Sequence, residues 1–228
     1  MVTQLAQPAV LFDVDGTLVD SNYLHIHAWQ RAFAEVGVEI EMWRVHRSIG
    51  MDGSTLVKEL SGDAPEDVQS QLKDAHSRYY KEAAPLLRPL PGARELLRRV
   101  ADLGLQVVLA TSAPEDELAM LREVLDSDDL VSEVTSSADV DTAKPKPDIV
   151  NVALERAGVT AEEAVFVGDA VWDAEACARA ELVSVGLLCG GVSRDELRDA
   201  GVAVVFENPE DLLKHLDESP IAKLIDKS

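Results

Sequence analysis

Residues 9–17 read AVLFDVDGT, an apolar run that ends in two aspartates spaced two positions apart. A short, continuously apolar run is typical of a strand that is buried on both faces, as in the middle of a parallel sheet. Two carboxylates placed directly after such a strand cannot both enter the core without a heavy desolvation cost. Strand alternation aims both side chains the same way, although a bend at Gly16 can rotate them apart. The stretch therefore indicates a central strand with acidic groups at its carboxyl end.

Further buried strands are expected along the chain. Apolar runs recur at residues 105–110 and 164–167, and weaker ones at 182–185 and 202–205. Amphipathic stretches of helical period lie between or after them, at residues 93–103, 115–125, 149–157, 195–200 and 209–216. Strands that alternate with helices predict an α/β fold, built on a parallel sheet with helices on both faces.

One region breaks this alternation. From Ser21 to about residue 84 the patterns are helical, and none reads as a convincing strand. We expect Ser21 to cap a helix that runs through Val36 and ends at Gly37, with further helices at 54–60 and 65–83. The sequence therefore predicts an all-helical insertion between the first strand and the second.

The two ends of this insertion predict its relation to the core. It leaves through residues 18–20 and returns through a stiff segment that contains Pro85, Pro89 and Pro91. We expect residues 1–20 and 86–228 to form the core and residues 21–85 to form a cap domain. An insertion that leaves and returns at neighbouring points is free to hinge, so a mobile cap is expected.

Acidic residues follow two of the predicted strands. Asp13 and Asp15 follow the first strand, Asp169 follows the strand at 164–167, and Asp173 lies one helical turn later. Ligands of open α/β sheets bind at the carboxyl ends of the strands, where these acids are expected to meet. Four converging acids repel one another strongly unless a cation lies among them. Oxygen ligands favour a hard ion, and we predict Mg²⁺.

Groups that can bind an anion are expected at the same edge. The run at 105–110 ends in Thr111 and Ser112, whose hydroxyls can donate to an oxyanion, and a helix start follows at Pro114. Lys144 supplies a cation, and its flanking prolines fix its backbone. Carboxylates, a metal, a lysine and hydroxyls together indicate a site of phosphoryl transfer.

Four segments of the chain resemble the motifs of the haloacid dehalogenase-like superfamily, in family order. Residues 13–21 (DVDGTLVDS) resemble motif one, Thr111 resembles motif two, Lys144 in KPKPD resembles motif three, and Gly168-Asp169 with Asp173 resembles motif four. The resemblance implies a Rossmann-like core, and the predicted insertion lies where the family's helical C1 caps lie. Members that cleave carbon–halogen bonds lack the second aspartate of motif one, so the presence of Asp15 favours phosphoryl chemistry.

The resemblance implies a role for each matched residue. Asp13 would attack phosphorus and become an aspartyl phosphate, and Asp15 would act as general acid and then general base. Mg²⁺ would be held by the Asp13 carboxylate, the Asp15 backbone carbonyl and Asp169.

The remaining motif residues would support this chemistry. Thr111, the amide of Ser112 and Lys144 would hold the phosphoryl oxygens, and Asp173 would steady either the metal's water shell or Lys144. The expected activity is Mg²⁺-dependent hydrolysis of a small phosphorylated metabolite.

Two other functions stay open on the sequence. In the β-phosphoglucomutase branch, a cap histidine placed like His25 handles substrate, so a sugar-phosphate mutase is the first alternative. However, that branch has a phosphate-binding arginine where this chain has Gly53. Arg47 could contact substrate or could be an exposed residue at a helix end. The second alternative is a non-enzymatic binding protein built on a core that has lost its catalytic activity. It is disfavoured because each main catalytic residue type is present.

Other cap residues carry weaker signals. The phosphonatase branch requires a cap lysine, and the nearest candidate, Lys58, lies in an ordinary helical pattern. His27, His76 and His215 show no ligand spacing, and we interpret them as surface or packing residues.

Composition limits the partners. Lys and Arg number 21 against 42 Asp and Glu, a net charge of −21, which argues against a broad nucleic-acid or anionic-membrane surface. There is no long apolar run and no signal-peptide pattern, so a cytoplasmic protein is expected. Cys177 and Cys189 are interpreted as small apolar residues. Nothing suggests an obligate assembly, and we expect a monomer, with a dimer as the alternative.

Overall fold

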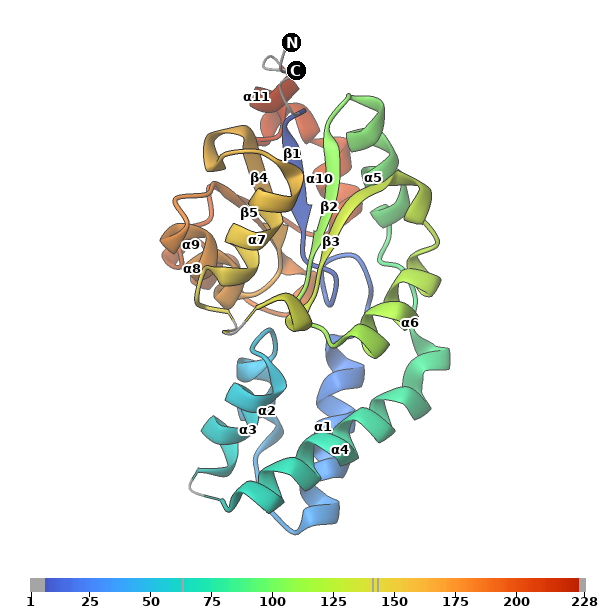
Figure 1. The fold of residues 1–228 in the computed structure, drawn as a ribbon, viewed down its shortest axis with the longest axis vertical. Coiled ribbons are helices and arrows are strands. Elements are labelled where there is room, and N and C mark those ends of the chain that lie inside the picture. The colour runs from blue at the N-terminus through green and yellow to red at the C-terminus, as the bar shows by residue number, and fades with distance from the viewer. Residues whose placement is uncertain (1–6, 63, 141, 143, 226–228) are drawn as a thin grey trace.

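A computed structural model describes residues 7–62, 64–140, 142 and 144–225. Its centre is a parallel sheet of six strands in the order β3-β2-β1-β4-β5-β6 (Figure 1). The strands are β1 (Ala9–Phe12), β2 (Gln106–Ala110), β3 (Val131–Thr135), β4 (Ala164–Gly168), β5 (Ser184–Leu187) and β6 (Val204–Phe206). The predicted α/β class is therefore confirmed, and the run that includes residues 9–12 forms a central strand.

Alternate residues of the central strands face opposite sides of the sheet. Val10 and Phe12 of β1 belong to an apolar cluster on one face, and Leu11 belongs to the cluster on the other. The first face is covered by α5 (Ala93–Asp102), α6 (Glu115–Leu125) and α10 (Pro209–Lys214). The second is covered by α7 (Asp148–Ala157) and α8 (Val171–Arg179), whose Cys177 is fully buried in that cluster. Two short helices, α9 (Arg194–Asp199) and α11 (Ala222–Ile225), complete the carboxyl-terminal part of the described chain.

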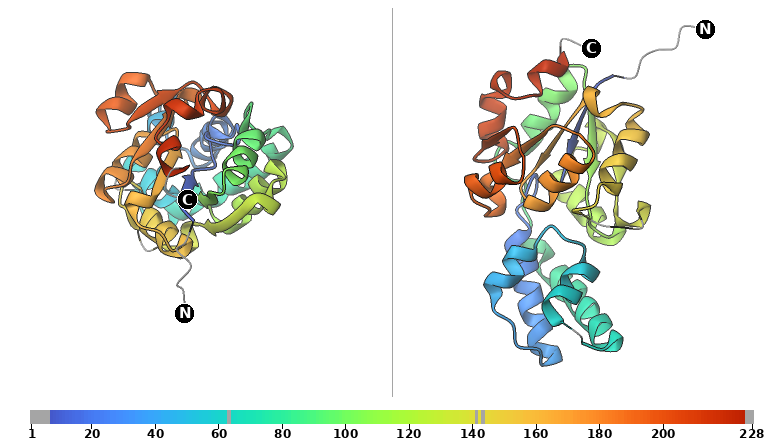
Figure 2. Two further views of the ribbon diagram at one scale, coloured as in Figure 1. Left: turned by 90° about the horizontal axis from the view of Figure 1, so that it is seen from above. Right: turned by 90° about the vertical axis from the view of Figure 1, so that its left-hand side faces the viewer.

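In the described part of the chain, four helices follow β1 and precede α5. They are α1 (Asn22–Val36), α2 (Met42–Ser48), α3 (Gly53–Ser61) and α4 (Glu66–Ala83), and we call this group the helical insertion. Figures 1 and 2 show it as a separate lobe beyond the carboxyl ends of the strands. It has its own apolar core, in which Trp29 and Phe33 of α1 pack with Leu56 of α3 and Leu72 of α4.

The two connectors of the insertion run side by side. The Asp20 amide donates to the Arg88 carbonyl (2.9 Å), and the Leu90 amide donates to the Leu18 carbonyl (2.9 Å). The chain thus leaves and re-enters the α/β part at neighbouring points.

Two expectations about the insertion need correction. The sequence pattern did not indicate α2, a short helix with only two buried residues, Val45 and Ser48. Ser21 precedes α1 but makes no capping hydrogen bond. Its hydroxyl donates instead to the Asp15 carboxylate (2.6 Å), because the chain turns back on itself between these residues. The left-handed residue at the end of α1 is Gly37, as expected.

No helix in the described part of the chain is both long and apolar enough to cross a membrane.

Candidate active site

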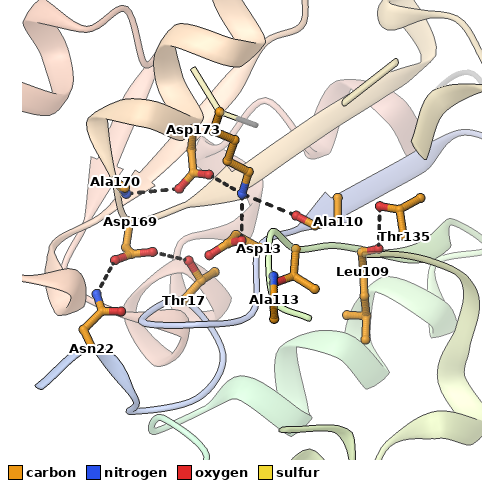
Figure 3. Close-up of polar contacts among 12 residues, drawn as sticks. Asp13, Thr17, Asn22, Leu109, Ala110, Ala113, Thr135, Asp169, Ala170 and Asp173 are labelled. Carbon is orange, nitrogen blue, oxygen red and sulfur yellow. Dashed lines mark hydrogen bonds and ion pairs between the residues drawn. The ribbon is translucent and has the colours of Figure 1, made fainter. Parts of the chain in front are cut away.

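Asp13 is the first residue after β1 and lies at the centre of the site. Its amide donates to the Val167 carbonyl of β4 (3.0 Å), which fixes the backbone between two central strands. Its carboxylate is buried, and Oδ1 accepts a hydrogen bond from Lys144 Nζ at 2.7 Å (Figure 3). Burial raises the pKa of Asp13 and outweighs the lowering effect of Lys144, while Asp173 and Asp169 raise it further. A cation would therefore stabilise the ionised form that a nucleophile requires.

Lys144 bridges two acids. Its Nζ also forms an ion pair with Asp173 Oδ1 at 2.6 Å and lies 3.4 Å from the Ala110 carbonyl. Burial acts to lower the pKa of this ammonium, but Asp13 and Asp173 together raise it well above its ordinary value. Lys144 is therefore a permanent positive charge beside Asp13. The ion pair places Asp173 against Lys144, the contact that one of its two predicted roles requires.

Asp169 approaches from the end of β4. Its Oδ1 accepts a hydrogen bond from Thr17 Oγ1 and its Oδ2 accepts one from Asn22 Nδ2, both at 2.8 Å (Figure 3). Burial is the main cause of its raised pKa, and Asp173 adds to it. These two hydrogen bonds hold the carboxylate towards Asp13.

The acids fit a divalent cation. Asp13, Asp169 and Asp173 each offer a carboxylate oxygen, and these oxygens all lie within 4.8 Å of one another. Lys144 is the ammonium that pairs with this group, so with all three carboxylates ionised, the form that a bound cation favours, the group carries a net charge of minus two. The backbone at Gly190 lies so close to Asp169 that a Cβ added to Gly190 would clash with the Asp169 carboxylate. Oxygen donors in a buried, doubly negative setting suit a hard ion such as Mg²⁺.

Asp15 does not join this acidic group, contrary to the expectation of four converging acids. Its Oδ1 accepts a hydrogen bond from Ser21 and lies 3.2 Å from Nε2 of His25 on α1. Burial acts to raise the pKa of Asp15, but the hydrogen bonds from His25 and Ser21 lower it below its ordinary value. The bend at Gly16, whose φ is +73°, separates the two aspartates into different surroundings.

A cavity of about 450 Å³ opens between the carboxyl ends of the strands and the helical insertion. Asp13, Asp15, Lys144 and Asp169 line it, together with Thr111 and Ser112 after β2. The Thr111 hydroxyl accepts a hydrogen bond from the Ala113 amide (3.1 Å), which orients it in the loop that precedes α6. All the residues predicted for the nucleophile, acid/base, phosphate and metal positions thus reach one cavity or, for Asp173, its edge through Lys144.

Two histidines of the insertion meet at the cavity wall. His25 Nδ1 lies 3.1 Å from Nε2 of His76 on α4, and the His76 ring stacks on Trp29 with ring centres 4.0 Å apart. Burial lowers the pKa of His76 well below its usual value, and His25 adds to this effect. The sequence analysis interpreted His76 as a surface or packing residue. It did not predict that His76 contacts His25 and lines the cavity. Spacing within the sequence could not find this contact, because it depends on how α1 packs against α4.

Arg47 is placed away from the cavity. Its Nη2 forms an ion pair with Glu196 of α9 at 2.5 Å, at the junction between the insertion and the rest of the molecule. Lys58 is exposed on α3 and does not line the cavity either. The hypothesis that Arg47 contacts substrate is therefore not supported by the geometry of this structure.

Comparison with known proteins identifies the family. The sequence model of the haloacid dehalogenase-like hydrolase family matches residues 10–187. The chain belongs to this family. The expectation of an enzyme is thereby confirmed: this is a haloacid dehalogenase-like hydrolase.

Relatives of similar length support this assignment. The chain is 29% identical to a phosphorylated carbohydrates phosphatase from Thermotoga maritima, covering 92% of this chain and 98% of the relative. It is 30% identical to a phosphoglycolate phosphatase from Rhodospirillum rubrum, covering 88% of this chain and 87% of that one. A solved hydrolase from Pseudomonas syringae superposes with a TM-score of 0.89 at 37% identity, over 93% of this chain and 99% of the other.

Proposed function

We propose that this hydrolase is a Mg²⁺-dependent phosphatase that cleaves a small phosphomonoester through an aspartyl phosphate on Asp13. The observation that carries the proposal is the pairing of the buried Asp13 carboxylate with Lys144 beside Asp169, in a cavity between the strand ends and the helical insertion. The names of the relatives agree with this activity.

The proposed first step forms the phosphoenzyme. A carboxylate oxygen of Asp13 forms a bond to phosphorus while the bond from phosphorus to the leaving oxygen breaks, and Asp15 gives that oxygen its proton. Lys144 and the Thr111 hydroxyl donate to the phosphoryl oxygens, where negative charge is concentrated. In the second step, Asp15 takes a proton from a water molecule, whose oxygen attacks phosphorus and releases the Asp13 carboxylate.

A metal ion completes the proposed site. Asp13, Asp169 and the Asp15 backbone carbonyl would hold Mg²⁺, with Asp173 fixing Lys144 beside it. Once bound, the ion offsets the charge of the phosphoryl group and of its carboxylate ligands.

We further propose that residues 21–85 act as a cap domain over a core formed by residues 1–20 and 86–228. The antiparallel connectors, which join the insertion to the core at one place, support hinge motion. Closure would exclude water from the phosphoryl site, and opening would admit substrate.

The mutase alternative is not adopted. A sugar bisphosphate needs a second anion site, and Gly53 offers the cavity no side chain for one. Among the described residues that line the cavity there is no arginine.

Replacing Asp13 with asparagine tests the proposal. We expect Mg²⁺-dependent phosphate release from p-nitrophenyl phosphate to fall by about 10⁴-fold or more, because the nucleophile is lost. Asp102→Asn, an exposed aspartate on α5, is the matched control and should retain activity. Full activity in Asp13→Asn would refute the assigned nucleophile.

A further inference from the structure

We propose that this cavity selects phosphomonoesters whose leaving group is an uncharged polyol or an amine, and rejects leaving groups that carry a second anion. Glu117 is the residue that we assign to this selection. The inference rests on the proposed phosphatase function and adds the substrate class.

The orientation of a bound substrate follows from the site. Its phosphoryl group would lie against Asp13, Lys144 and Thr111, and its leaving oxygen would face the general acid, Asp15. The leaving group therefore occupies the part of the cavity beyond Asp15, which is lined by the insertion and by the first turn of α6. The side chains in this part determine which leaving groups fit.

Glu117 lies in that part of the cavity, in the first turn of α6. Its side chain lines the cavity although the residue is only 5% exposed. Among the described residues, none donates a hydrogen bond to its carboxylate. Burial raises its pKa, and the lowering effect of His25 does not offset this. The carboxylate is open to the cavity and has no donor in the described part of the chain, so a donor from the substrate would stabilise it.

The other charges around the leaving group are mostly negative. Asp52, Asp74 and Asp116 also line the cavity, and Lys73 is the one lysine of the described lining besides Lys144. His25 also lines the cavity; burial acts to lower its pKa, but its contact with Asp15 raises it, and its charge is paired with Asp15. Asp116 forms an ion pair with Lys81 at 2.6 Å, and Asp52 accepts hydrogen bonds from the first amides of α3. Lys73 is exposed and donates to the Ser54 hydroxyl at 3.1 Å. This balance disfavours a second anion.

Neutral or cationic leaving groups should therefore bind beside Glu117 more favourably than anionic ones. A hydroxyl or ammonium group can donate to Glu117 and satisfy it. A carboxylate or second phosphate beside Glu117 would either be repelled or force the glutamate to take up a proton, and both cost free energy. Trp29, Met51 and Leu56 offer apolar surface for the carbon skeleton, and the volume of about 450 Å³ suits a hexose-sized group.

Three sugar phosphates with the same ring test the proposal. They are glucose 1-phosphate, glucosamine 1-phosphate and glucuronic acid 1-phosphate, whose leaving groups are neutral, cationic and anionic. With the full-length wild-type protein and Mg²⁺, we expect kcat/KM for the glucuronic acid ester to be lower than for the other two by about tenfold or more. By the same reasoning, 2-phosphoglycolate should be a poorer substrate than 2-hydroxyethyl phosphate.

Two matched variants test whether Glu117 causes the selectivity against anionic leaving groups. Glu117→Gln should narrow the gap between the glucuronic acid and glucosamine esters by about tenfold, because it removes one charge at the leaving group. Glu115→Gln removes the same charge from the same helix turn but lies outside the cavity, and it should leave the gap unchanged.

The outcomes separate this inference from the proposed function. If wild-type protein hydrolyses none of these esters and not p-nitrophenyl phosphate, the phosphatase proposal itself fails. If it hydrolyses p-nitrophenyl phosphate but treats the three sugar esters alike, or prefers the glucuronic acid ester, only the selectivity is refuted. If the wild-type protein preferred the anionic ester and Lys73→Gln abolished that preference, the cavity lining beyond Asp15 would be an anion-binding surface, which would refute the proposal. The wild-type comparison stands even if Glu117→Gln fails to fold.

Discussion

Asp13 and Asp15 are two residues apart but have opposite surroundings. Asp13 lies between Lys144 and two other acids, whereas Asp15 accepts hydrogen bonds from Ser21 and His25. Different surroundings can give two carboxylates different roles in one reaction. The acidic group with its lysine suits a nucleophile that receives a phosphoryl group. The histidine contact lowers the pKa of Asp15 and raises that of His25, so His25 is a proton source beside the carboxylate that is proposed to give and take a proton.

His76 makes a residue-level prediction about pH. Its folded-state pKa lies well below the usual value, mainly because the ring is buried. As pH falls below about 6.5, the unfolded chain binds a proton on His76 that the folded chain does not bind, so the free energy of unfolding decreases. His76→Phe keeps a ring against Trp29 but cannot titrate. Between about pH 7 and pH 5, the variant should lose less unfolding free energy than wild type, by about 1–2 kcal/mol.

Urea unfolding at the two pH values measures this difference. The exposed His27 of α1 allows a matched control, His27→Phe, which removes a histidine without touching the ring stack. Equal pH dependence in wild type and His76→Phe would show that His76 takes up its proton as readily in the folded chain as in the unfolded one.

At the scale of elements, the sequence predicted the strands that are buried on both faces. The strands β1, β2 and β4 were predicted because both of their faces are covered, which leaves an unbroken apolar run. The strand β3 was missed because it lies at the sheet edge and reads VSEVT, with one fully buried residue. Asp13, Thr111 and Asp169 could be placed together because parallel strands end at one edge, whereas Lys144 lies in the loop after the missed strand β3 and was assigned to the site by its chemistry and the family resemblance.

The contacts between distant elements could not be predicted in the same way. His25 and His76 are 51 positions apart and meet only because α1 packs along α4. Glu117 reads as an ordinary acid in the first turn of a helix, and Arg47 as an ordinary basic residue near a helix end. Their different positions, one in the cavity and one paired with Glu196, depend on how the insertion lies against the core.

The turn after β5 makes a prediction at the element scale. A Cβ at Gly190, the last residue of the short 3₁₀ helix Leu188–Gly190, would strike the Asp169 carboxylate. Gly190→Ala should therefore displace this carboxylate and lower Mg²⁺-dependent kcat/KM by about 10²-fold. Activity measured across a Mg²⁺ titration, with the melting temperature alongside, tests this.

Gly186→Ala is the control for that substitution. Its added methyl would meet Leu197 and Val202 instead, so it should affect stability more than activity. If Gly190→Ala retained full activity at low Mg²⁺, Asp169 would not need the position it has in this structure.

At the scale of the whole molecule, the net charge of −21 opposes the approach of an anionic substrate. Attraction is then expected to be local to Lys144, which is buried and little affected by salt, and to the proposed metal. Raising NaCl from about 10 to about 150 mM should screen the repulsion and increase kcat/KM, by about twofold. Initial rates at low substrate concentration measure this. A marked decrease with salt would indicate long-range attraction that the charge balance does not provide.

The most direct test of the central claim, that Asp13 accepts the phosphoryl group, is a crystal structure grown with Mg²⁺ and beryllofluoride. We predict a beryllium–oxygen bond to the Asp13 carboxylate, with Lys144 and Thr111 at the fluorine atoms and the metal between Asp13 and Asp169. Beryllofluoride bonded to another residue, or a metal bound away from these two carboxylates, would contradict the account.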